Sequence, residues 1–512
     1  MKHPSLIRLA GLTGLVFALI GGPATMVFAG SYTASTPIQA SAATSPFAGC
    51  SIGSIGEDNL PGTNYTNAEV EPRIAVNPTN SKNMIGVFQQ DRWSNGGAHG
   101  LVAAYTMDGG TTWKQSWAHF SECAGGTVAN GGDFERASDP WVTFAPNGDA
   151  YQIALTTTFQ ASSLGVPLVD GAVLVSKSTD GGKTWSEPIT LRRDSGRASG
   201  FFFFNDKESI TADPTNSQYV YAVWDRAASP TSTSNSSVIG VEHARAFHQP
   251  VWFARTTDGG KTWQPSSIIF DPGPTSFTIG NQIAVLPDGT LLDVFDTGDF
   301  DHAGKSTFTE NVIRSTDHGK TWSKPIVVSQ DEDIGVSDPV TGAPLRTGSG
   351  IPDIAVDRSS GAAYVVWEDA RFSGGQREGI ALSKSTDDGR TWSAPEQVNQ
   401  VTSTQAFTPT VTVASDGTVG VSYYDLRNAT TDPSTLLTDY WLVHSSDGGA
   451  TWSENHVAGP FNELAAPFAG GYFLGDYEGL GTVGKTFVPF FVQAVPGTAA
   501  DPTNAFASTV GP

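Results

Sequence analysis

The chain has 512 residues, and its 51 acidic and 29 basic side chains give a net charge of −22 at neutral pH. Without a cluster of Lys and Arg, such a chain is a poor partner for nucleic acid or an anionic membrane, because phosphate binding needs a concentrated basic face. Its 57 glycines and 31 prolines, with 38% hydrophobic residues, indicate a globular protein rich in turns and poor in long helices.

The N-terminus has the order of a secretory signal peptide. Basic residues precede an apolar run at 9–20, and small residues lead up to Ala29. The run is shorter than the roughly 20 residues of a membrane-spanning helix. We therefore expect residues 1–29 to be a signal peptide, with the cleavage site open, and the mature protein to be secreted and extracellular. Residues 30–48 are rich in Ser, Thr and Ala, which predicts a flexible linker.

The two cysteines of the chain, Cys50 and Cys123, both follow the expected cleavage site. Export to an oxidising compartment permits a disulfide between them. The sequence gives no Cα separation, so one disulfide and two free thiols both remain open.

One octapeptide recurs six times and organises the remainder of the chain, residues 49–512. Its shared pattern is Ser or Thr, then any residue, Asp, a variable position, Gly, another variable position, Thr and Trp. The copies lie at 106–113, 178–185, 256–263, 315–322, 385–392 and 445–452. From Asp108 to Asp447 the intervals average about 68 residues, which leaves room for four short strands per repeat. We expect Asp to cap turn amides, Gly to supply positive φ, and Trp to fill the space between sheets.

The octapeptide resembles the Asp-box, or BNR repeat, of the sialidase (neuraminidase) superfamily. The resemblance implies an all-β fold, a β-propeller of four-stranded antiparallel blades. Another pair of strands, within 475–492, follows the sixth box, so the sequence favours seven blades and leaves six as the alternative. We expect a strand near 505–510 and an N-terminal strand near 50–55 to complete the last blade and remove its exposed edges.

Three residues on first strands of different repeats are candidates for one central site. Arg73 with Ile74 resembles the Arg-Ile-Pro motif of sialidases, and Tyr477 with Leu480 resembles the Tyr-Ser-x-Leu motif that carries their nucleophile. Glu208 is placed like the glutamate of the family. A neutral tyrosine suits sialic acid, because the substrate's carboxylate would repel an ionised Asp or Glu nucleophile. The resemblance therefore implies Tyr477 as nucleophile and Glu208 as its base.

The resemblance also implies an acid/base aspartate and three arginines that hold the substrate's carboxylate. Asp91 is the nearest candidate for the acid/base, since 94–100 contains no aspartate. The substrate-binding candidates are Arg73, Arg226 and Arg427, with Arg92 and Arg371 as substitutes. Structural ion pairs at strand ends remain the alternative for the repeated Asp-x-Arg sequences.

These residues predict a secreted glycosidase of the exo-α-sialidase type, acting on sialic acid or another acidic sugar of a glycan or glycoconjugate. We expect a monomer without cofactor or metal. Because no aspartate stands at the expected acid/base position, two alternatives stay open: a non-catalytic propeller that binds glycans or proteins, and a uronic-acid lyase or hydrolase. The acidic runs at 296–301 and 331–333 are candidates for Ca²⁺, with solvated loops as the alternative.

Overall fold

The computed structural model describes residues 32–163, 167–199, 202–229, 248–274, 276–300, 306–495 and 500–512. Tyr32–Pro512 form one compact unit. The expected signal peptide, residues 1–29, lies outside the described residues. Among the described residues, no helix has the length and apolarity to cross a membrane.

Six antiparallel sheets, the repeat sheets, follow one another along the chain, each with four strands paired in sequence order. The first two are joined by the pair Ala98 and Ala137. Their strands are β3 (Glu69–Val76), β4 (Met84–Arg92), β5 (Ala98–Thr106) and β6 (Lys114–Ser116); then β7 (Arg136–Phe144), β8 (Ala150–Gln160), β9 (Leu168–Ser178) and β10 (Ile189–Ser195). The third and fourth contain β11 (Phe202–Ala212), β12 (Val220–Ser229), β13 (Val251–Thr256) and β14 (Ser267–Phe270); then β15 (Ser276–Val285), β16 (Leu291–Phe300), β17 (Ser306–Ser315) and β18 (Ile326–Gln330). The fifth and sixth contain β21 (Asp353–Val356), β22 (Ala363–Asp369), β23 (Gly379–Ser385) and β24 (Glu396–Gln397); then β25 (Ala406–Val413), β26 (Val419–Asp425), β27 (Leu437–Ser445) and β28 (Ser453–Asn462).

A terminal sheet follows the six repeat sheets. A small three-stranded sheet combines two strands that lie between the fourth and fifth repeat sheets in the chain with one strand that follows the sixth. The terminal sheet contains β30 (Gly479–Val483), β31 (Thr486–Ala494), β32 (Thr503–Ala507) and β33 (Val510–Gly511), joined by β1 (Thr33–Ala34) and β2 (Ile38–Gln39). The small sheet contains β19 (Val336–Ser337), β20 (Pro344–Arg346) and β29 (Tyr472–Phe473). Helical segments are short: α1 (Gly196–Ser199) and 3-10 turns at Glu122–Ala124, Arg371–Ser373 and Glu463–Ala465. The predictions of an all-β fold and of four-stranded antiparallel sheets are confirmed.

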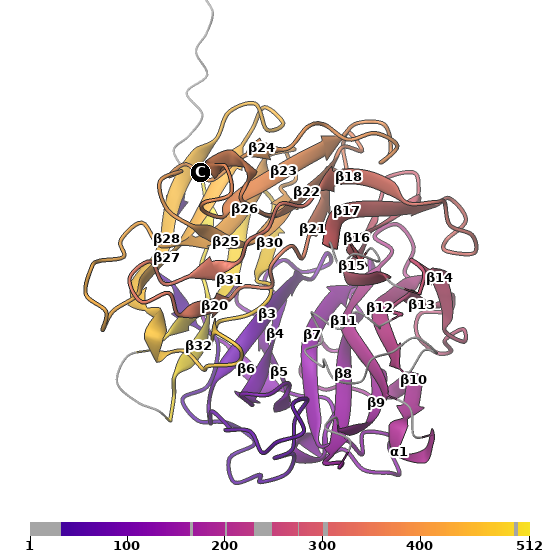
Figure 1. The fold of residues 1–512 in the computed structure, drawn as a ribbon. Helices are drawn as coiled ribbons and strands as arrows, with labels where there is room; N and C mark the ends of the chain where they lie inside the picture. Colours follow the sequence, from indigo (N-terminus) through magenta and orange to yellow (C-terminus); the bar gives the residue numbers. More distant parts are fainter. Residues whose placement is uncertain are drawn as a thin grey trace, which may run out of the picture. The chain divides into compact units, whose positions relative to one another are not determined.

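The first strands of successive sheets contact one another. β3 contacts β7, β7 contacts β11, β11 contacts β15, β15 contacts β21, β21 contacts β25, β25 contacts β30, and β30 contacts β3. In Figure 1 these strands lie near the middle and the later strands of each sheet lie further out. Side chains of the first strands therefore meet around one axis, and this arrangement positions the candidate site.

The N-terminal segment completes the terminal sheet. β1 pairs with β33 and β2 with β32, and Phe47 is buried in the core beside β3 and β31. Residues 32–48 therefore do not form the flexible linker expected from their composition, because their backbone and apolar side chains have partners. The strand expected at 50–55 is absent: that stretch forms only an isolated bridge between Ile55 and Pro61, and β1 and β2 join the terminal sheet in its place. The strand expected near 505–510 is present as β32 and β33.

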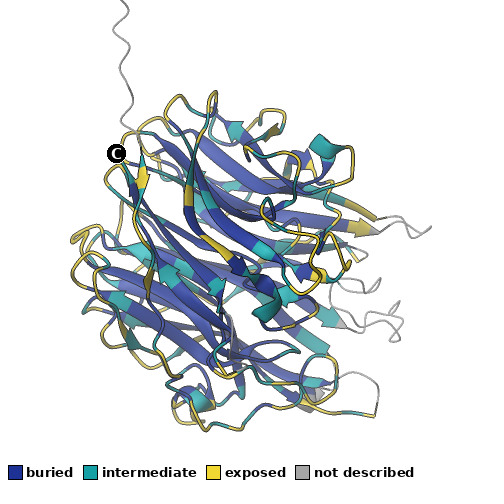
Figure 2. Cartoon of the chain, turned by 90° about the vertical axis from the view of Figure 1, so that its left-hand side faces the viewer, coloured by how far each residue is buried: buried dark blue, intermediate teal, exposed yellow. Residues whose placement is uncertain are grey.

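The core lies between neighbouring sheets, and Figure 2 shows the strands buried and the exposed residues gathered in the connecting loops. Trp322 of the fourth box packs against a cluster that contains Phe253 of the third repeat sheet and Phe295 of the fourth. The other box tryptophans also pack against clusters shared by neighbouring sheets: Trp113, Trp185, Trp263, Trp392 and Trp452. The expected role of the box tryptophan is confirmed.

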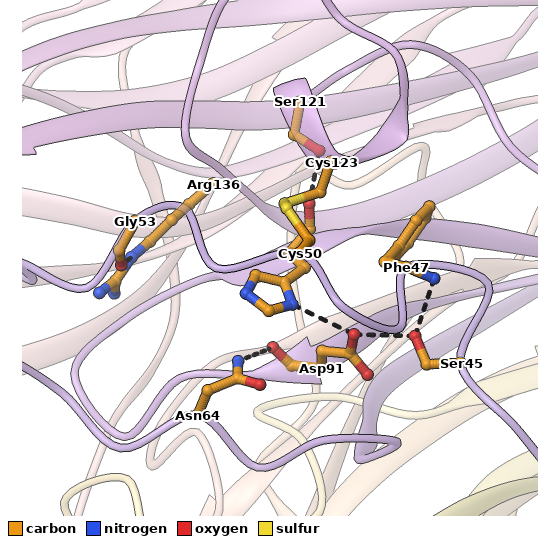
Figure 3. Close-up of a disulfide and its surroundings, with 10 residues drawn as sticks. Ser45, Phe47, Cys50, Gly53, Asn64, Asp91, Ser121, Cys123 and Arg136 are labelled. Carbon is orange, nitrogen blue, oxygen red and sulfur yellow. Dashed lines mark hydrogen bonds and ion pairs between the residues drawn. A yellow bond between two sulfur atoms is a disulfide. The ribbon is translucent and has the colours of Figure 1, made fainter.

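Cys50 and Cys123 form a disulfide with a Cα separation of 5.8 Å, drawn in Figure 3. The bond ties the segment before β3 to the 3-10 turn that follows β6. The structure therefore contains one disulfide where the sequence left two free thiols as the alternative.

Each Asp-box forms the turn between the third and fourth strands of its repeat sheet. In the first box Thr112 donates its backbone N–H to Asp108 Oδ1 at 3.0 Å and its hydroxyl to Oδ2 at 2.7 Å. The N–H of Gly110, whose φ is +89°, donates to Thr106 Oγ1 at 3.0 Å. The Asp–Thr pair recurs in the other five boxes. The expected capping role of the aspartate is confirmed.

These hydrogen bonds lower the pKa values of the Asp-box carboxylates. Donation by Thr112 lowers the pKa of Asp108 to about 2, and the equivalent threonines lower the pKa values of Asp258, Asp387 and Asp447 to about 2. Because the folded-state pKa lies below the ordinary value of about 3.9, the stabilisation is complete above that pH and is lost as the pH falls towards 2. We expect Thr112→Val to lower the melting temperature at pH 5 and the difference to shrink as the pH falls below 4. A difference that stays constant across this range would contradict the role of the ionised carboxylate.

Candidate functional site

A pocket, the axial pocket, opens where the first strands meet. Its atom-free space is about 500 Å³, a volume that includes the open solvent at its mouth. Its wall includes Arg73 (β3), Trp141 (β7), Lys207, Glu208 and Ser209 (β11), Asn281 and Gln282 (β15), Thr347, Ile351, Pro352, Asp353 (β21), Glu368 (β22), Thr410 (β25), and Asp476 and Tyr477 before β30. All six repeats and the terminal sheet therefore contribute to one site.

A repeated irregularity of the first strands aims side chains at this axis. In β3, β7, β11, β15 and β25, two successive residues fall out of register with the second strand. The first residue of each pair has positive φ: Glu71 (+55°), Asp139 (+54°), Lys207 (+47°), Gly280 (+77°) and Thr408 (+51°). Positive φ is uncommon for residues other than glycine, and bulges of this kind redirect side chains near functional sites. The bulges explain how charged residues of separate sheets come together.

Lys207 lies at the centre of a buried group of carboxylates that we call the lysine cluster. Its Nζ is 2.6 Å from Asp476 Oδ2, 3.3 Å from Glu71 Oε1 and 3.9 Å from Asp139 Oδ2. All four side chains are buried. Burial alone would lower the pKa of Lys207, but Asp476, Glu71 and Asp139 raise it above the ordinary value. The lysine is therefore charged, and it neutralises part of the surrounding negative charge.

Arg346 of β20 brings a second cation to Asp476. Its Nε donates to Oδ1 at 3.0 Å and its Nη2 to Oδ2 at 2.6 Å. Burial would raise the pKa of Asp476, but Arg346 and Lys207 hold it well below its usual range. Asp476 is therefore an ionised carboxylate in the wall of the axial pocket.

Glu208 lies in the same wall as Asp476, but its surroundings disfavour the ionised form. Its side chain is 2% exposed, and neither carboxyl oxygen has a hydrogen-bond partner among the described residues. Burial, followed by the charge of Asp139, raises the pKa of Glu208 well above its ordinary value. These surroundings favour the protonated carboxyl, which can act as a proton donor.

Tyr477 and Arg73 complete the set of predicted residues that the structure brings together. The hydroxyl of Tyr477 donates to the carbonyl oxygen of Pro140 at 3.3 Å, and burial raises its pKa well above the ordinary value. Arg73 lies over the ring of Trp141 at 3.9 Å and pairs with Asp353 at 3.2 Å. Tyr477, Glu208 and Arg73 therefore line one pocket, as the resemblance to sialidases implies.

The other predicted arginines do not line the axial pocket. Three of them have a carboxylate partner: Arg226 with Asp194 (2.7 Å), Arg427 with Asp425 (2.6 Å) and Glu454 (2.7 Å), and Arg371 with Asp369 (2.6 Å). Arg92 is buried over the ring of Phe473 and donates to Gln89 Oε1 at 2.9 Å, beside the lysine cluster. The expected three-arginine clamp is not assembled, because carboxylates hold Arg226, Arg427 and Arg371 in ion pairs outside the pocket wall.

Asp91, the expected acid/base, lies near the disulfide and outside the pocket wall (Figure 3). Its Oδ2 accepts the hydroxyl of Ser45 at 2.8 Å and lies 3.1 Å from His99 Nδ1, while its Oδ1 accepts the N–H of Asn67 at 2.7 Å. Both carboxylate oxygens are thus used to hold the N-terminal segment against β4. This geometry gives Asp91 a structural role in place of the one expected.

Sequence reasoning missed Lys207, Asp476 and Arg346. One signal was present: Glu71, Asp139 and Thr408 each precede a proline at the start of a first strand. Proline cannot donate to the ladder and is confined in sheets to edges, strand starts and bulges. That recurrence could have located the bulges, and with them the charged residues of the axis.

Comparison with known proteins supports the resemblance to sialidases. Residues 313–324, around the fourth box, match the BNR/Asp-box repeat. Over 299 residues the chain is 28% identical to a sialidase of Bacteroides fragilis; the match covers 55% of this chain and 48% of that protein, so the chain spans about half the length of this relative.

Several glycosidases are among the solved structures that this chain resembles, and their sequence identity to it is low. An α-L-arabinanase of Penicillium chrysogenum, complexed with arabinobiose, is 13% identical, with 93% of this chain and 98% of that chain covered and a TM-score of 0.46. A Hadza microbial sialidase is 16% identical, with coverage of 88% and 68% and a TM-score of 0.40. An α-L-arabinofuranosidase of Fusarium graminearum, also complexed with arabinobiose, is 13% identical, with coverage of 90% and 98% and a TM-score of 0.43.

Proposed function

We propose that this protein is a β-propeller glycoside hydrolase that cleaves an uncharged sugar glycoside in the axial pocket. The observation that carries the proposal is a pair of carboxyl groups in one pocket wall, of which Glu208 is buried without a side-chain partner among the described residues and Asp476 is paired with Lys207 and Arg346. Burial raises the pKa of Glu208, whereas Arg346 and Lys207 lower that of Asp476. Glycosidases commonly pair a protonated carboxyl with an ionised one.

Each residue then has a defined role. Glu208 donates its proton to the leaving-group oxygen as the glycosidic bond breaks. Asp476 supplies negative charge near the oxocarbenium-like transition state, while Lys207 and Arg346 keep it ionised. A water molecule then adds to the anomeric carbon and gives up a proton that restores Glu208 to its protonated form. The rings of Trp141 and Tyr477, 5.3 Å apart between centroids, offer apolar surface to a sugar ring.

The ion pairs of the pocket favour an uncharged substrate. Arg73 is paired with Asp353, and Lys207 is surrounded by the carboxylates of the lysine cluster. A substrate carboxylate would have to displace a protein carboxylate from one of these cations, which costs desolvation and an existing charge pair.

A sialidase is the second candidate, favoured by a different observation. Tyr477, Glu208 and Arg73 share one pocket, and the chain is similar to the sialidase of Bacteroides fragilis. In that reaction Tyr477 attacks the anomeric carbon and Glu208, as a carboxylate, accepts the tyrosine proton.

The architecture and location of the protein belong to the same proposal. The contacts that lead from β3 through the repeat sheets to β30 and back to β3 support a closed ring of seven blades. The disulfide between Cys50 and Cys123 supports export, because disulfides persist in oxidising compartments.

Hydrolysis of a panel of fluorogenic glycosides tests the proposal, with uncharged pentosides and hexosides beside a sialoside. We expect the purified chain to turn over an uncharged glycoside at least tenfold faster than the sialoside. Faster turnover of the sialoside, abolished in Tyr477→Phe, would establish the sialidase instead. Binding on a glycan array without turnover of any substrate would indicate a non-catalytic propeller.

A further inference from the structure

Three buried carboxyl groups meet in the fourth repeat sheet, away from the groups assigned to catalysis. Asp296 of β16 and Glu310 of β17 are directly opposite in the ladder, and Asp331 follows β18. One oxygen of each lies within 4.8 Å of the others. Their exposed fractions are 4%, 0% and 8%. The fold thus brings together one residue from each of the acidic runs at 296–301 and 331–333.

Within the described part of the chain, two of these carboxyls lack partners that buried acids normally have, while Asp331 Oδ1 accepts the backbone N–H of Asp333 at 3.0 Å. Neither oxygen of Glu310 nor Oδ1 of Asp296 has a hydrogen-bond partner among the described residues. None of the ion pairs between described residues includes Asp296, Glu310 or Asp331, and the nearby Arg371 is paired with Asp369. Like charges opposite one another in a ladder, and unpartnered buried polar atoms, are both destabilising. The arrangement therefore calls for a cation that the protein itself does not supply.

We propose that Asp296, Glu310 and Asp331 form a Ca²⁺ site. All three donors are carboxylate oxygens. Hard cations such as Ca²⁺ prefer oxygen ligands, whereas Zn²⁺ is commonly bound by histidine nitrogen and cysteine sulfur. Ca²⁺ binds oxygen at about 2.4 Å, so two of its ligands can lie up to about 4.8 Å apart, whereas the shorter bonds of Mg²⁺ allow only about 4.2 Å. The three carboxylate oxygens lie within 4.8 Å of one another, so a single Ca²⁺ can contact all of them.

The site also touches the segment that leads to the axial pocket. Gly350 has φ +68°, and a Cβ on it would lie 2.6 Å from Asp331 Oδ2. The next residues, Ile351 and Pro352, are part of the pocket wall. An ion bound by Asp296, Glu310 and Asp331 would therefore fix this wall as well as the middle of β16 and β17.

Calcium binding by the full chain tests the inference and does not depend on any enzymatic activity. The chain is stripped with a chelator and dialysed against Ca²⁺, and bound calcium is measured by atomic emission together with the melting temperature. We expect Glu310→Gln and Asp296→Asn each to bind one equivalent of Ca²⁺ fewer than the wild type and to lose the rise in melting temperature that Ca²⁺ gives. Asp388→Asn, which removes a half-exposed acid of the fifth Asp-box, should bind as the wild type does.

Three results would overturn the inference. They are wild-type protein that binds no Ca²⁺, a calcium content of Glu310→Gln equal to that of the wild type, and Mg²⁺ that raises the melting temperature as much as Ca²⁺ at equal concentration. If one variant fails to fold, the other variant and the wild-type measurement still decide the question.

Discussion

Lys207→Met is expected to lower the free energy of unfolding by about 3–5 kcal/mol at neutral pH, because it leaves buried carboxylates without their central cation. Glu71, Asp139 and Asp476 all approach the lysine Nζ within 3.9 Å. Methionine keeps the length of the side chain and removes only its charge and hydrogen bonds. The measurement is the midpoint of urea unfolding at pH 7.

The pH dependence of this loss follows from the carboxylates. Lys207 lowers the pKa values of Glu71 and Asp476, so its removal raises both, and the variant loses stability relative to the wild type as the pH rises above about 4. We expect the difference between variant and wild type to be larger at pH 7 than at pH 4.5. Lys485→Met is the matched control. The side chain of Lys485 is 61% exposed, and its Nζ lies 3.3 Å from Asp416 Oδ2. Surface ion pairs of this kind contribute at most about 1 kcal/mol. Equal effects of the two substitutions would contradict the central role of Lys207.

The fold was predictable because its signal is local. Within each Asp-box the aspartate, glycine and threonine form a turn whose hydrogen bonds lie within a few residues of one another, as for Asp108 and Thr112. Six such turns fix six hairpins, and the box tryptophan shows that each hairpin packs on a neighbour. The closing strands β1 and β2 were missed because they are only two residues long and lie in a stretch whose composition is typical of linkers.

Only those residues of the candidate site whose place in the pocket follows from their position on a first strand could be predicted from the sequence. Arg73, Glu208 and Tyr477 were found because a propeller gathers first strands around its axis. Arg427 was misassigned because its Asp-x-Arg sequence gives the guanidinium a local carboxylate, Asp425. Arg226 was misassigned because its partner is Asp194 of β10, a pairing that the sequence pattern does not show. Lys207 was missed since a two-residue bulge breaks the alternation of inward and outward side chains from which strand faces are predicted.

Glu208→Gln is expected to lower kcat on the uncharged glycoside identified by the substrate panel by about 10²–10⁴-fold, because glutamine has the same shape but no acidic proton to transfer. Both carboxyl oxygens of Glu208 lack hydrogen-bond partners among the described residues, so the substitution breaks no such contact. Its raised pKa means that the wild type keeps its proton donor to higher pH than an exposed glutamate would. The alkaline decline of kcat/KM in the wild type should therefore be absent from the variant.

Two comparisons separate proton donation from a structural effect. Glycosides whose leaving group departs without protonation should recover most of their turnover in Glu208→Gln, since the lost step is no longer needed. Glu463→Gln removes another buried carboxyl, whose pKa burial raises to about 7 and which contacts Thr438 outside the pocket wall. We expect that variant to keep the wild-type kcat and pH profile. If Glu208→Gln is equally impaired with good and poor leaving groups, Glu208 is not the proton donor, and the opposite displacement of its pKa from that of Asp476 then reflects burial and ion pairing alone.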